Sequence, residues 1–122
     1  MILVDSTVWI DHLHSADDIM LQLLKERRVL MHPFVIGEIA LGHVRRRDAV
    51  LEELSDLRRV TIAENEEVLQ FIRDEGLFGI GIGYIDAHLL TSAKLTKGVS
   101  LWTLDRHLRA AAAKLGLSAD AP

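Results

Sequence analysis

Residues 1–13 read MILVDSTVWIDHL, and this stretch decides the class of fold. Residues 2–4 form a short apolar run without alternation, which is typical of a central parallel strand covered on both faces. Asp5 follows directly, and with Ser6 and Thr7 it supplies the polar side chains that favour the start of a helix. A strand that passes at once into a helix predicts an α/β domain.

The same alternation of strands and helices continues to the end of the chain. Further strands are predicted at residues 29–31, 60–62 and 99–103. Further helices are predicted at residues 17–27, 33–46, 48–57, 64–75, 84–97 and 105–115. Residues 76–83, GLFGIGIG, predict a tightly turned loop. We therefore expect a single domain over residues 1–122, a three-layer α/β/α sandwich with a central parallel sheet.

Composition limits the classes of function. The chain has no cysteine, which excludes disulfides and cysteine-based zinc sites and fits a reducing compartment. Its apolar start lacks a basic flank and no apolar run could span a bilayer, so we expect a cytoplasmic protein without a membrane partner. The net charge of −4 argues against a plain nucleic-acid-binding module, which is usually basic. The negative charge counts less against a metal-dependent nuclease, because bound cations would supply part of the positive charge that faces the nucleic acid.

Four acidic residues differ from the others, which lie in charged helical runs. They are Asp5, Glu38, Asp86 and Asp105. Asp5 and Asp105 each follow an apolar strand at the end where ligand sites form in parallel sheets. Glu38 and Asp86 lie among apolar neighbours on predicted helices, where an unpaired carboxylate is costly.

Each of these acids also has a purely structural explanation. The two that follow strands are favoured helix caps. Glu38 could pair with Arg45 or Arg46, and Asp86 could interact with the dipole of its helix. Together they favour a cluster, in which mutual repulsion keeps some carboxyls protonated unless a cation joins them. All-oxygen ligands suit Mg²⁺ or Mn²⁺, which promote phosphodiester hydrolysis by activating water.

The segments that carry the acids resemble PIN-domain ribonucleases of the VapC toxin type. In chain order they are MILVDSTVWIDHL (1–13), PFVIGEIALG (33–42), GIGYIDAHLLTSA (81–93) and LWTLDRHLRAAA (101–112). The resemblance implies a PIN-like fold and an endoribonuclease toxin that uses Mg²⁺ or Mn²⁺. The four acids would form its catalytic and metal-binding site, and Thr7 and Thr103 would be supporting hydroxyls.

The resemblance also implies partners. The RNA substrate would be cut by metal-activated water, and a cognate antitoxin protein would hold the activity off. A homodimer is implied as well, and a higher oligomer in complex with the antitoxin. From their place beside Asp5 on a helix that needs one face for the core, we expect Trp9, Ile10 and Leu13 to form the exposed antitoxin-docking surface.

Other chemistries fit less well. The chain has six histidines, but no His-Glu-x-x-His pattern, and His12 and His14 would not share a helix face, which argues against zinc. His88 and His107 are expected at the surface or in support of the acids. The tryptophans are expected in the core or an interface. The arginine clusters at 27–28, 45–47 and 58–59 are explained by helix dipoles or by RNA steering.

Two rival functions share features with this chain. A receiver-like phosphoacceptor domain needs an acidic pair after the first strand and a lysine after the last, and this chain has neither. A non-catalytic PIN-like interaction module is the main alternative. Such modules typically lose one or more of the acids, whereas all four are present here.

Overall fold

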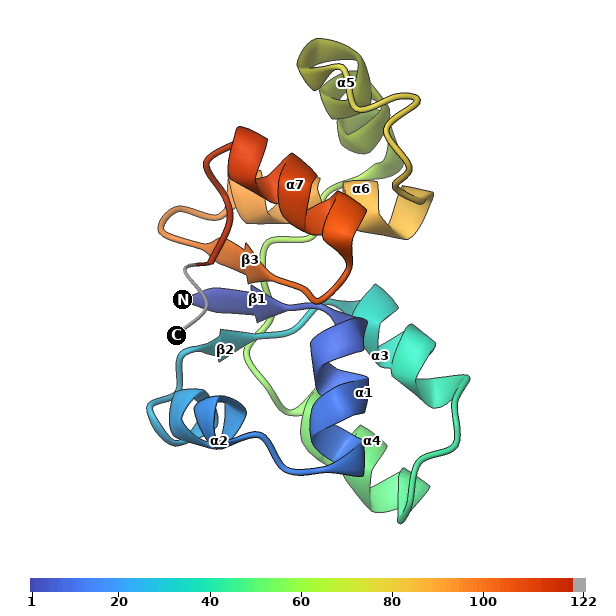
Figure 1. The fold of residues 1–122 in the computed structure, drawn as a ribbon. Coiled ribbons are helices and arrows are strands. Elements are labelled where there is room, and N and C mark those ends of the chain that lie inside the picture. Colours follow the sequence, from blue (N-terminus) through green and yellow to red (C-terminus); the bar gives the residue numbers. More distant parts are fainter. Residues whose placement is uncertain (120–122) are drawn as a thin grey trace.

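The computed structural model describes residues 1–119, and a parallel three-stranded sheet lies at its centre (Figure 1). The strands are β1 (Ile2–Val4), β2 (Val29–Leu30) and β3 (Ser100–Trp102), in the order β2-β1-β3. Ile2 pairs with Val29 on one side and with Ser100 on the other. The first strand of the chain is therefore the central one, as its uninterrupted apolar run predicted.

Helices surround this sheet. They are α1 (Ser6–His14), α2 (Asp18–Lys25), α3 (Pro33–Ala40), α4 (Arg47–Ser55), α5 (Asn65–Glu75), α6 (Tyr84–Leu95) and α7 (Arg106–Lys114). In Figure 1, α6 and α7 lie beside β3, α1, α2 and α4 lie toward β2, and α5 projects away from the sheet. The expected three-layer α/β/α fold is confirmed. No helix within residues 1–119 is both long enough and apolar enough to cross a membrane.

The core is built around β1 and α6. Leu3 and Val4 are fully buried, and residues 87–93 of α6 are all buried as well. Trp9 and Trp102 are both buried, which confirms their expected place in the core. The strand ends are thereby held on a rigid support, and side chains placed at those ends have fixed positions.

The predicted strand at 60–62 is wrong. Within the described residues, an isolated parallel bridge forms just before this segment, between Met31 and Arg59, and the N–H of Val60 donates to the carbonyl of Met31 (3.1 Å). Beyond that bridge the acceptors are hydroxyls in α6 and at its end: the N–H of Thr61 donates to the Oγ1 of Thr96 (3.0 Å), and the N–H of Ala63 donates to the Oγ of Ser92 (3.1 Å). Because these hydroxyls satisfy the backbone, no ladder forms.

The predicted helix at 33–46 is also too long, because α3 ends at Ala40. A turn follows around Gly42, and Arg46 adopts a left-handed conformation (φ 52°) as the N-cap of α4. The arginine cluster at 45–47 therefore lies at the start of a helix. The dipole explanation predicted for it is wrong, since cations are favoured at the opposite end.

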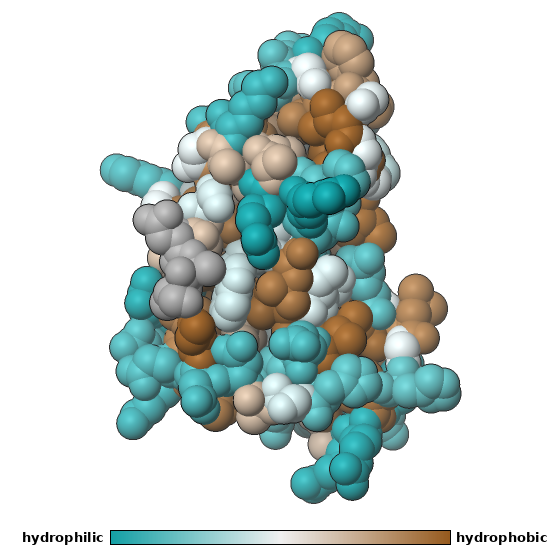
Figure 2. Space-filling model, in the orientation of Figure 1, coloured by the Kyte–Doolittle hydropathy of each residue, from teal (hydrophilic) through white to brown (hydrophobic). Residues whose placement is uncertain are grey.

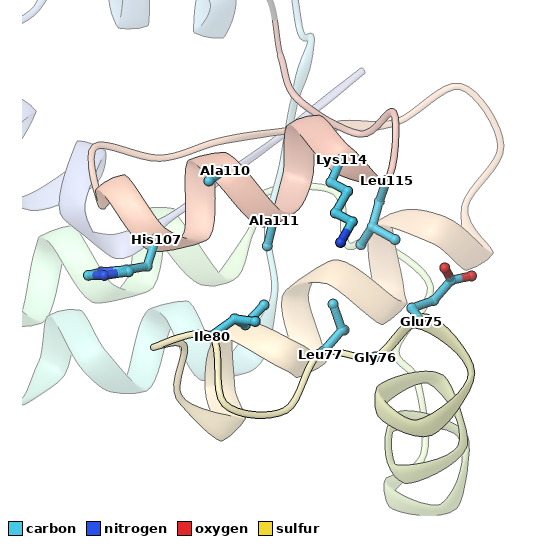
Figure 3. Close-up of a pocket in the computed structure, with 9 residues that line it drawn as sticks. All are labelled: Glu75, Gly76, Leu77, Ile80, His107, Ala110, Ala111, Lys114 and Leu115. Carbon is cyan, nitrogen blue, oxygen red and sulfur yellow. The ribbon is translucent and has the colours of Figure 1, made fainter.

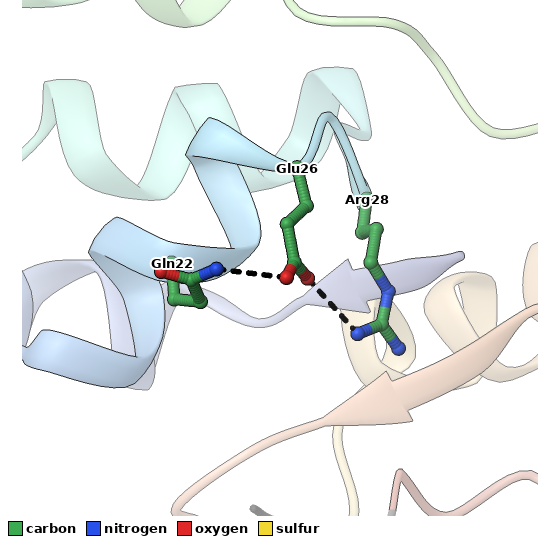
Figure 4. Close-up of polar contacts among 3 residues, drawn as sticks. All are labelled: Gln22, Glu26 and Arg28. Atoms are coloured by element: carbon green, nitrogen blue, oxygen red, sulfur yellow. Dashed lines mark hydrogen bonds and ion pairs between the residues drawn. The ribbon is translucent and has the colours of Figure 1, made fainter.

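Surface ion pairing in the described chain is confined to one contact. An Nη1 of Arg28 lies 3.2 Å from Glu26, whose other oxygen accepts from Gln22 at 2.8 Å (Figure 4). These hydrogen bonds lower the pKa of Glu26, first through Gln22 and then through Arg28. Within residues 1–119, none of the four singled-out acids has a cationic partner. The predicted alternative of a Glu38 ion pair with Arg45 or Arg46 is therefore wrong.

The start of α3 depends on a buried neutral histidine. His32 is fully buried and is the N-cap of α3, with Pro33 as the first helical residue. The Nδ1 of His32 accepts the backbone N–H of Phe34 (3.0 Å). Burial, then the charges of His88 and Arg59, lowers the pKa of His32 to about 4. A protonated Nδ1 could no longer accept, so the cap requires the neutral ring.

We predict that His32 makes the fold acid-sensitive. Because its folded pKa lies below the unfolded value, its contribution is complete above the ordinary histidine pKa and is lost as the pH falls toward 4. The loss should reach about 3 kcal/mol. Urea unfolding between pH 7 and pH 4 measures it. His32→Asn keeps a capping oxygen and should reduce the dependence of the unfolding free energy on pH. His14→Asn, at an exposed position, should leave that dependence unchanged. Equal slopes for wild type and His32→Asn would refute this role.

Candidate active site

The site lies at the carboxyl end of the sheet. Asp5 directly follows β1, and Asp105 follows β3 after a two-residue turn. The backbone N–H of Asp5 donates to the carbonyl of Trp102 (2.9 Å), which fixes the two strand ends side by side. Figure 1 shows α3 and α7 beginning close to this end of β1.

The carboxylate of Asp5 is buried and is held by two threonines. Its Oδ2 accepts from the hydroxyls of Thr7 (2.8 Å) and Thr103 (2.7 Å). Thr7 in turn accepts the N–H of Leu104, and Thr103 accepts the N–H of Asp105, each at 3.0 Å. Both hydroxyl protons therefore point to Asp5. The prediction that Asp5 is a side-chain helix cap is wrong, because its side chain makes no cap hydrogen bond.

The other three acids are each held by one hydrogen bond. The hydroxyl of Ser6 donates to Oε1 of Glu38 (3.1 Å), and the N–H of Gly83 donates to Oδ2 of Asp86 (3.1 Å). Asp105 caps α7, as predicted, by accepting the N–H of Leu108 (2.9 Å). Among residues 1–119, the second oxygen of each of these carboxylates has no protein donor. Those oxygens are available to a ligand.

Ser6 is a member of the site that the sequence did not single out. Its position directly after Asp5 suggested only a helix start. The signal was present in the pattern: α1 and α3 both begin at the same edge, so the first hydroxyl of one helix can reach a carboxylate of the other. Ser6 is buried, and its hydrogen bond to Glu38 joins these two helices.

Electrostatics links the four acids. Burial raises the pKa of Glu38, and the charges of Asp5 and Asp86 raise it further, while the hydrogen bond from Ser6 lowers it. Burial also raises the pKa of Asp86, against the hydrogen bond from Gly83, and the charges of Asp5 and Asp105 add to the rise. The structure thus brings all four predicted acids into one mutually repelling group.

The donor set suits a hard divalent cation. It consists of carboxylate and hydroxyl oxygens, which are the ligands of Mg²⁺ and Mn²⁺. Within the described chain, no three histidine or acidic side chains already lie close enough together to hold an ion. A bound cation would offset the repulsion among these carboxylates. In the chemistry of their donor atoms, the residues therefore fit a divalent cation.

Comparison with known proteins agrees with this geometry. The PIN domain family matches residues 2–114. The chain belongs to the PIN-domain family. It is also 43% identical over 118 residues to Ribonuclease VapC32 of Mycobacterium tuberculosis strain CDC 1551 / Oshkosh, over 97% of this chain and 95% of that protein. The same values hold for Ribonuclease VapC32 of strain ATCC 25618 / H37Rv. The expected membership among VapC-type PIN-domain ribonucleases is confirmed.

A glycine-rich loop borders the site of this PIN domain. At Gly81 the backbone has φ +85°, and an added Cβ would lie 2.9 Å from the His107 ring, so this position requires glycine. The ring of His107 therefore packs directly on the loop. Behind it lies a cavity of about 260 Å³ between α7 and residues 75–80, with Ile80 and Leu77 facing Ala111 (Figure 3). This cavity is lined mostly by apolar residues, with Glu75, His107 and Lys114 among them, and contains none of the four acids.

Two other sequence expectations about this PIN domain are corrected. Trp9 is only 3% exposed, so it cannot be an exposed docking residue, whereas Ile10 is 40% exposed and Leu13 is half-buried. His88 is buried rather than at the surface, and its Nε2 lies 3.0 Å from the Oδ1 of Asn65. Both side chains turn inward because α1 and α6 are covered on more of their faces than their periodicity indicated.

The repulsion among the acids should limit the stability of the metal-free PIN domain. Asp86→Asn should leave it at least as stable as wild type at pH 7, because it removes one repelling charge and keeps an oxygen for Gly83. The raised pKa of Asp86 means that its destabilising effect grows as the pH rises through that pKa, so the variants should converge in acid. Thermal melting in EDTA measures both effects.

Asp86→Ala is the matched control, because it removes the charge and also the hydrogen bond to Gly83. It should be less stable than Asp86→Asn by about 1 kcal/mol. Adding Mg²⁺ or Mn²⁺ should raise the melting temperature of wild type and leave an Asp5→Asn/Asp86→Asn double variant nearly unchanged. A marked loss of stability in Asp86→Asn would instead assign Asp86 a structural role.

Proposed function

We propose that this protein is a metal-dependent endoribonuclease that acts as the toxin of a toxin–antitoxin pair. The proposal rests on one observation: Asp5, Glu38, Asp86 and Asp105 lie around one sheet edge and repel one another, without a cationic partner within residues 1–119. Asp5 is buried and Glu38 and Asp86 are partly buried, and like charges placed in this way are costly unless a ligand joins them. Identity to a protein named Ribonuclease VapC32 supports RNA as the substrate.

Asp5, Glu38, Asp86 and Asp105 would hold Mg²⁺ or Mn²⁺. A bound divalent cation lowers the pKa of water and neutralises charge on the phosphate. Thr7 and Thr103 occupy Oδ2 of Asp5 and so leave its Oδ1 to face the ligand. Ser6 does the same for Glu38, since it occupies Oε1 and leaves Oε2. These hydroxyls are positioning groups, and they fix the direction of each carboxylate before the ligand arrives.

The histidines offer no clear metal-independent route. His12, His32 and His88 are engaged in hydrogen bonds with Asp17, Phe34 and Asn65. The remaining three lie against other surfaces: His14 and His43 line a cavity beside α4, and His107 packs on the glycine-rich loop. The cavity lined by His14 and His43 contains none of the four acids, so no pair of histidines at the acidic site supports acid–base chemistry that uses the ribose 2′-hydroxyl and leaves a cyclic phosphate.

The central test is RNA cleavage by the purified protein. Cutting should be endonucleolytic, leave a 5′-phosphate and a 3′-hydroxyl, and stop in EDTA. Asp5→Asn, Glu38→Gln and Asp86→Asn should each slow it on the order of 100-fold or more, because each removes a ligand charge. Asp105→Asn should slow it less, since Asp105 is exposed and also caps α7. End-labelled RNA with product analysis provides the measurement.

Glu52→Gln, an exposed change on α4, is the control and should cut like wild type. Cleavage that persists in EDTA would refute the metal requirement. Products that carry a 2′,3′-cyclic phosphate would refute the mechanism even with the fold unchanged. Acid variants that remain fully active while folded would show that the four carboxylates are not the site.

We also propose where the antitoxin docks. A cavity of about 450 Å³ opens between α1, α3 and α4, lined by apolar side chains that include Ile10, Leu13 and Val50. It is bordered by Arg45 and His43, so an apolar antitoxin segment with acidic flanks would fit. On the face that Figure 2 shows, apolar residues lie in separate areas among hydrophilic ones.

Ile10→Asp should weaken antitoxin binding by about 2 kcal/mol or more, because it places a charge in an apolar contact. Isothermal titration calorimetry with a purified segment of the antitoxin measures this affinity. Leu21→Asp, which changes an exposed apolar residue on α2, is the matched control and should bind normally. Unchanged affinity in Ile10→Asp would remove this surface from consideration.

The oligomeric state is proposed from the family resemblance. We expect a homodimer, and a higher oligomer once the antitoxin is bound. Exposed apolar side chains on α5 and the following loop, Leu69 and Phe78, are 60% and 71% exposed and are available for such contacts.

A further inference from the structure

Two exposed aromatic side chains flank a buried histidine next to the acidic site. Phe34 and Tyr84 are 39% and 46% exposed. The ring of Phe34 lies 4.8 Å from the ring of His88, and the ring of Tyr84 lies 4.7 Å from it, both in edge-on geometry. These two residues come from α3 and α6, the same helices that carry Glu38 and Asp86.

The pair is close to the carboxylates along each helix. Phe34 precedes Glu38 by four residues, so both lie on one face of α3, one turn apart. Tyr84 lies in the first turn of α6, as does Asp86. The backbone positions of the two aromatic residues therefore lie within about one helical turn of those of the carboxylates, and Tyr84 and Asp86 project from different sides of α6.

Hydrogen bonds hold the tyrosine in place. Its hydroxyl donates to the Oδ1 of Asn65 (3.0 Å), and the same oxygen lies 3.0 Å from Nε2 of His88. The acceptor Oδ1 requires the proton of His88 to be on Nε2. The side-chain amide of Asn65 in α5 thus holds both the ring of Tyr84 and the ring of His88 against which Tyr84 packs. Because the ring of Tyr84 is already fixed, less entropy is lost when a partner stacks on it.

Charge gives a reason for such contacts. The net charge is −4 and the site itself is acidic, so phosphate contacts contribute little to RNA affinity. Stacking of bases on aromatic faces needs no charge and is tolerant of sequence. Unpaired bases have free faces, whereas paired ones do not.

We propose that Phe34 and Tyr84 form a stacking platform that holds an unpaired base of the RNA beside the carboxylates. The inference rests on the proposed nuclease function and deepens it, because it assigns these two residues as the groups that position the RNA. Asn65 and His88 support the platform from beneath. An extruded base fixed there positions the adjacent phosphate at the acidic site.

The experiment measures RNA binding separately from cleavage. In an Asp5→Asn background, which blocks turnover, Phe34→Leu and Tyr84→Leu should each weaken binding of a mixed-sequence single-stranded oligoribonucleotide on the order of tenfold by fluorescence anisotropy. Leucine keeps apolar bulk and removes the flat ring. Tyr84→Phe and Phe34→Tyr should retain wild-type affinity. The loss should be the same at low and moderate salt, because stacking releases no counterions.

A double-mutant cycle between the protein and the RNA identifies the stacked base. Removing single bases along the oligonucleotide should weaken wild-type binding at one position, and the same removal should cost nothing more in Tyr84→Leu. With the unaltered Asp5, the leucine variants should raise KM more than they lower kcat. Melting curves and far-UV circular dichroism confirm that each variant is folded. If Phe34→Leu is unstable, the cycle at Tyr84 decides alone.

The outcomes separate this inference from the proposed function. Wild type that cuts RNA, with leucine variants that bind and cut equally well, would overturn the platform and leave the nuclease intact. RNA binding that weakens as expected, without any cleavage by wild type, would overturn the nuclease and leave the platform. Leucine variants that lose antitoxin affinity but keep RNA affinity would show a protein-docking surface instead, and would overturn the inference.

Discussion

The buried carboxylate of Asp5 imposes the strictest requirement on this structure. Asp5 is 3% exposed at the end of the central strand, where an unsatisfied charge would cost several kcal/mol. Thr7 and Thr103 meet that requirement with two short hydrogen bonds, and both hydroxyls also accept backbone N–H groups from the segment that follows β3. The turn that leads to Asp105 is thereby tied to the side chain of Asp5. Two acids that are far apart in the sequence are positioned by one network.

The other half of the site depends on how α1, α3 and α6 begin. Ser6 links the first turn of α1 to Glu38, Gly83 links the loop before α6 to Asp86, and His32 caps the helix that carries Glu38. Each acid therefore has one oxygen committed to the protein and one free. That division is useful in a binding site, because the committed oxygen fixes the direction of the carboxylate while the free oxygen meets the ligand. Burial raises the pKa of Glu38 and of Asp86, and the charges of the neighbouring acids raise it further.

The sequence predicted the central strand and the approximate positions of the helices, and it singled out the four acids, because all of these follow from local patterns. An apolar run before an aspartate, or a carboxylate among apolar helix neighbours, is visible without a structure. The errors concern features that depend on distant partners. Residues 60–62 look like a strand, yet the N–H of Thr61 donates to the hydroxyl of Thr96, and that of the following Ala63 donates to the hydroxyl of Ser92. Trp9 was expected on the free face of a helix, but α1 is packed on more than one side. Ser6 and Asn65 acquire their roles only from residues that are distant in the chain.

An acidic protein that binds a polyanion must replace the usual basic surface with something else. Cations at the carboxylates would offset the repulsion locally, but they act only at the reacting phosphate and hold little of the rest of the strand. Aromatic faces act on the bases, which carry no charge, and so they avoid the repulsion altogether. The position of Phe34 and Tyr84 on the helices that carry Glu38 and Asp86 brings both kinds of contact within reach of one nucleotide. Selectivity then follows from the need for an unpaired base, since a duplex presents phosphates to this surface and keeps its base faces hidden.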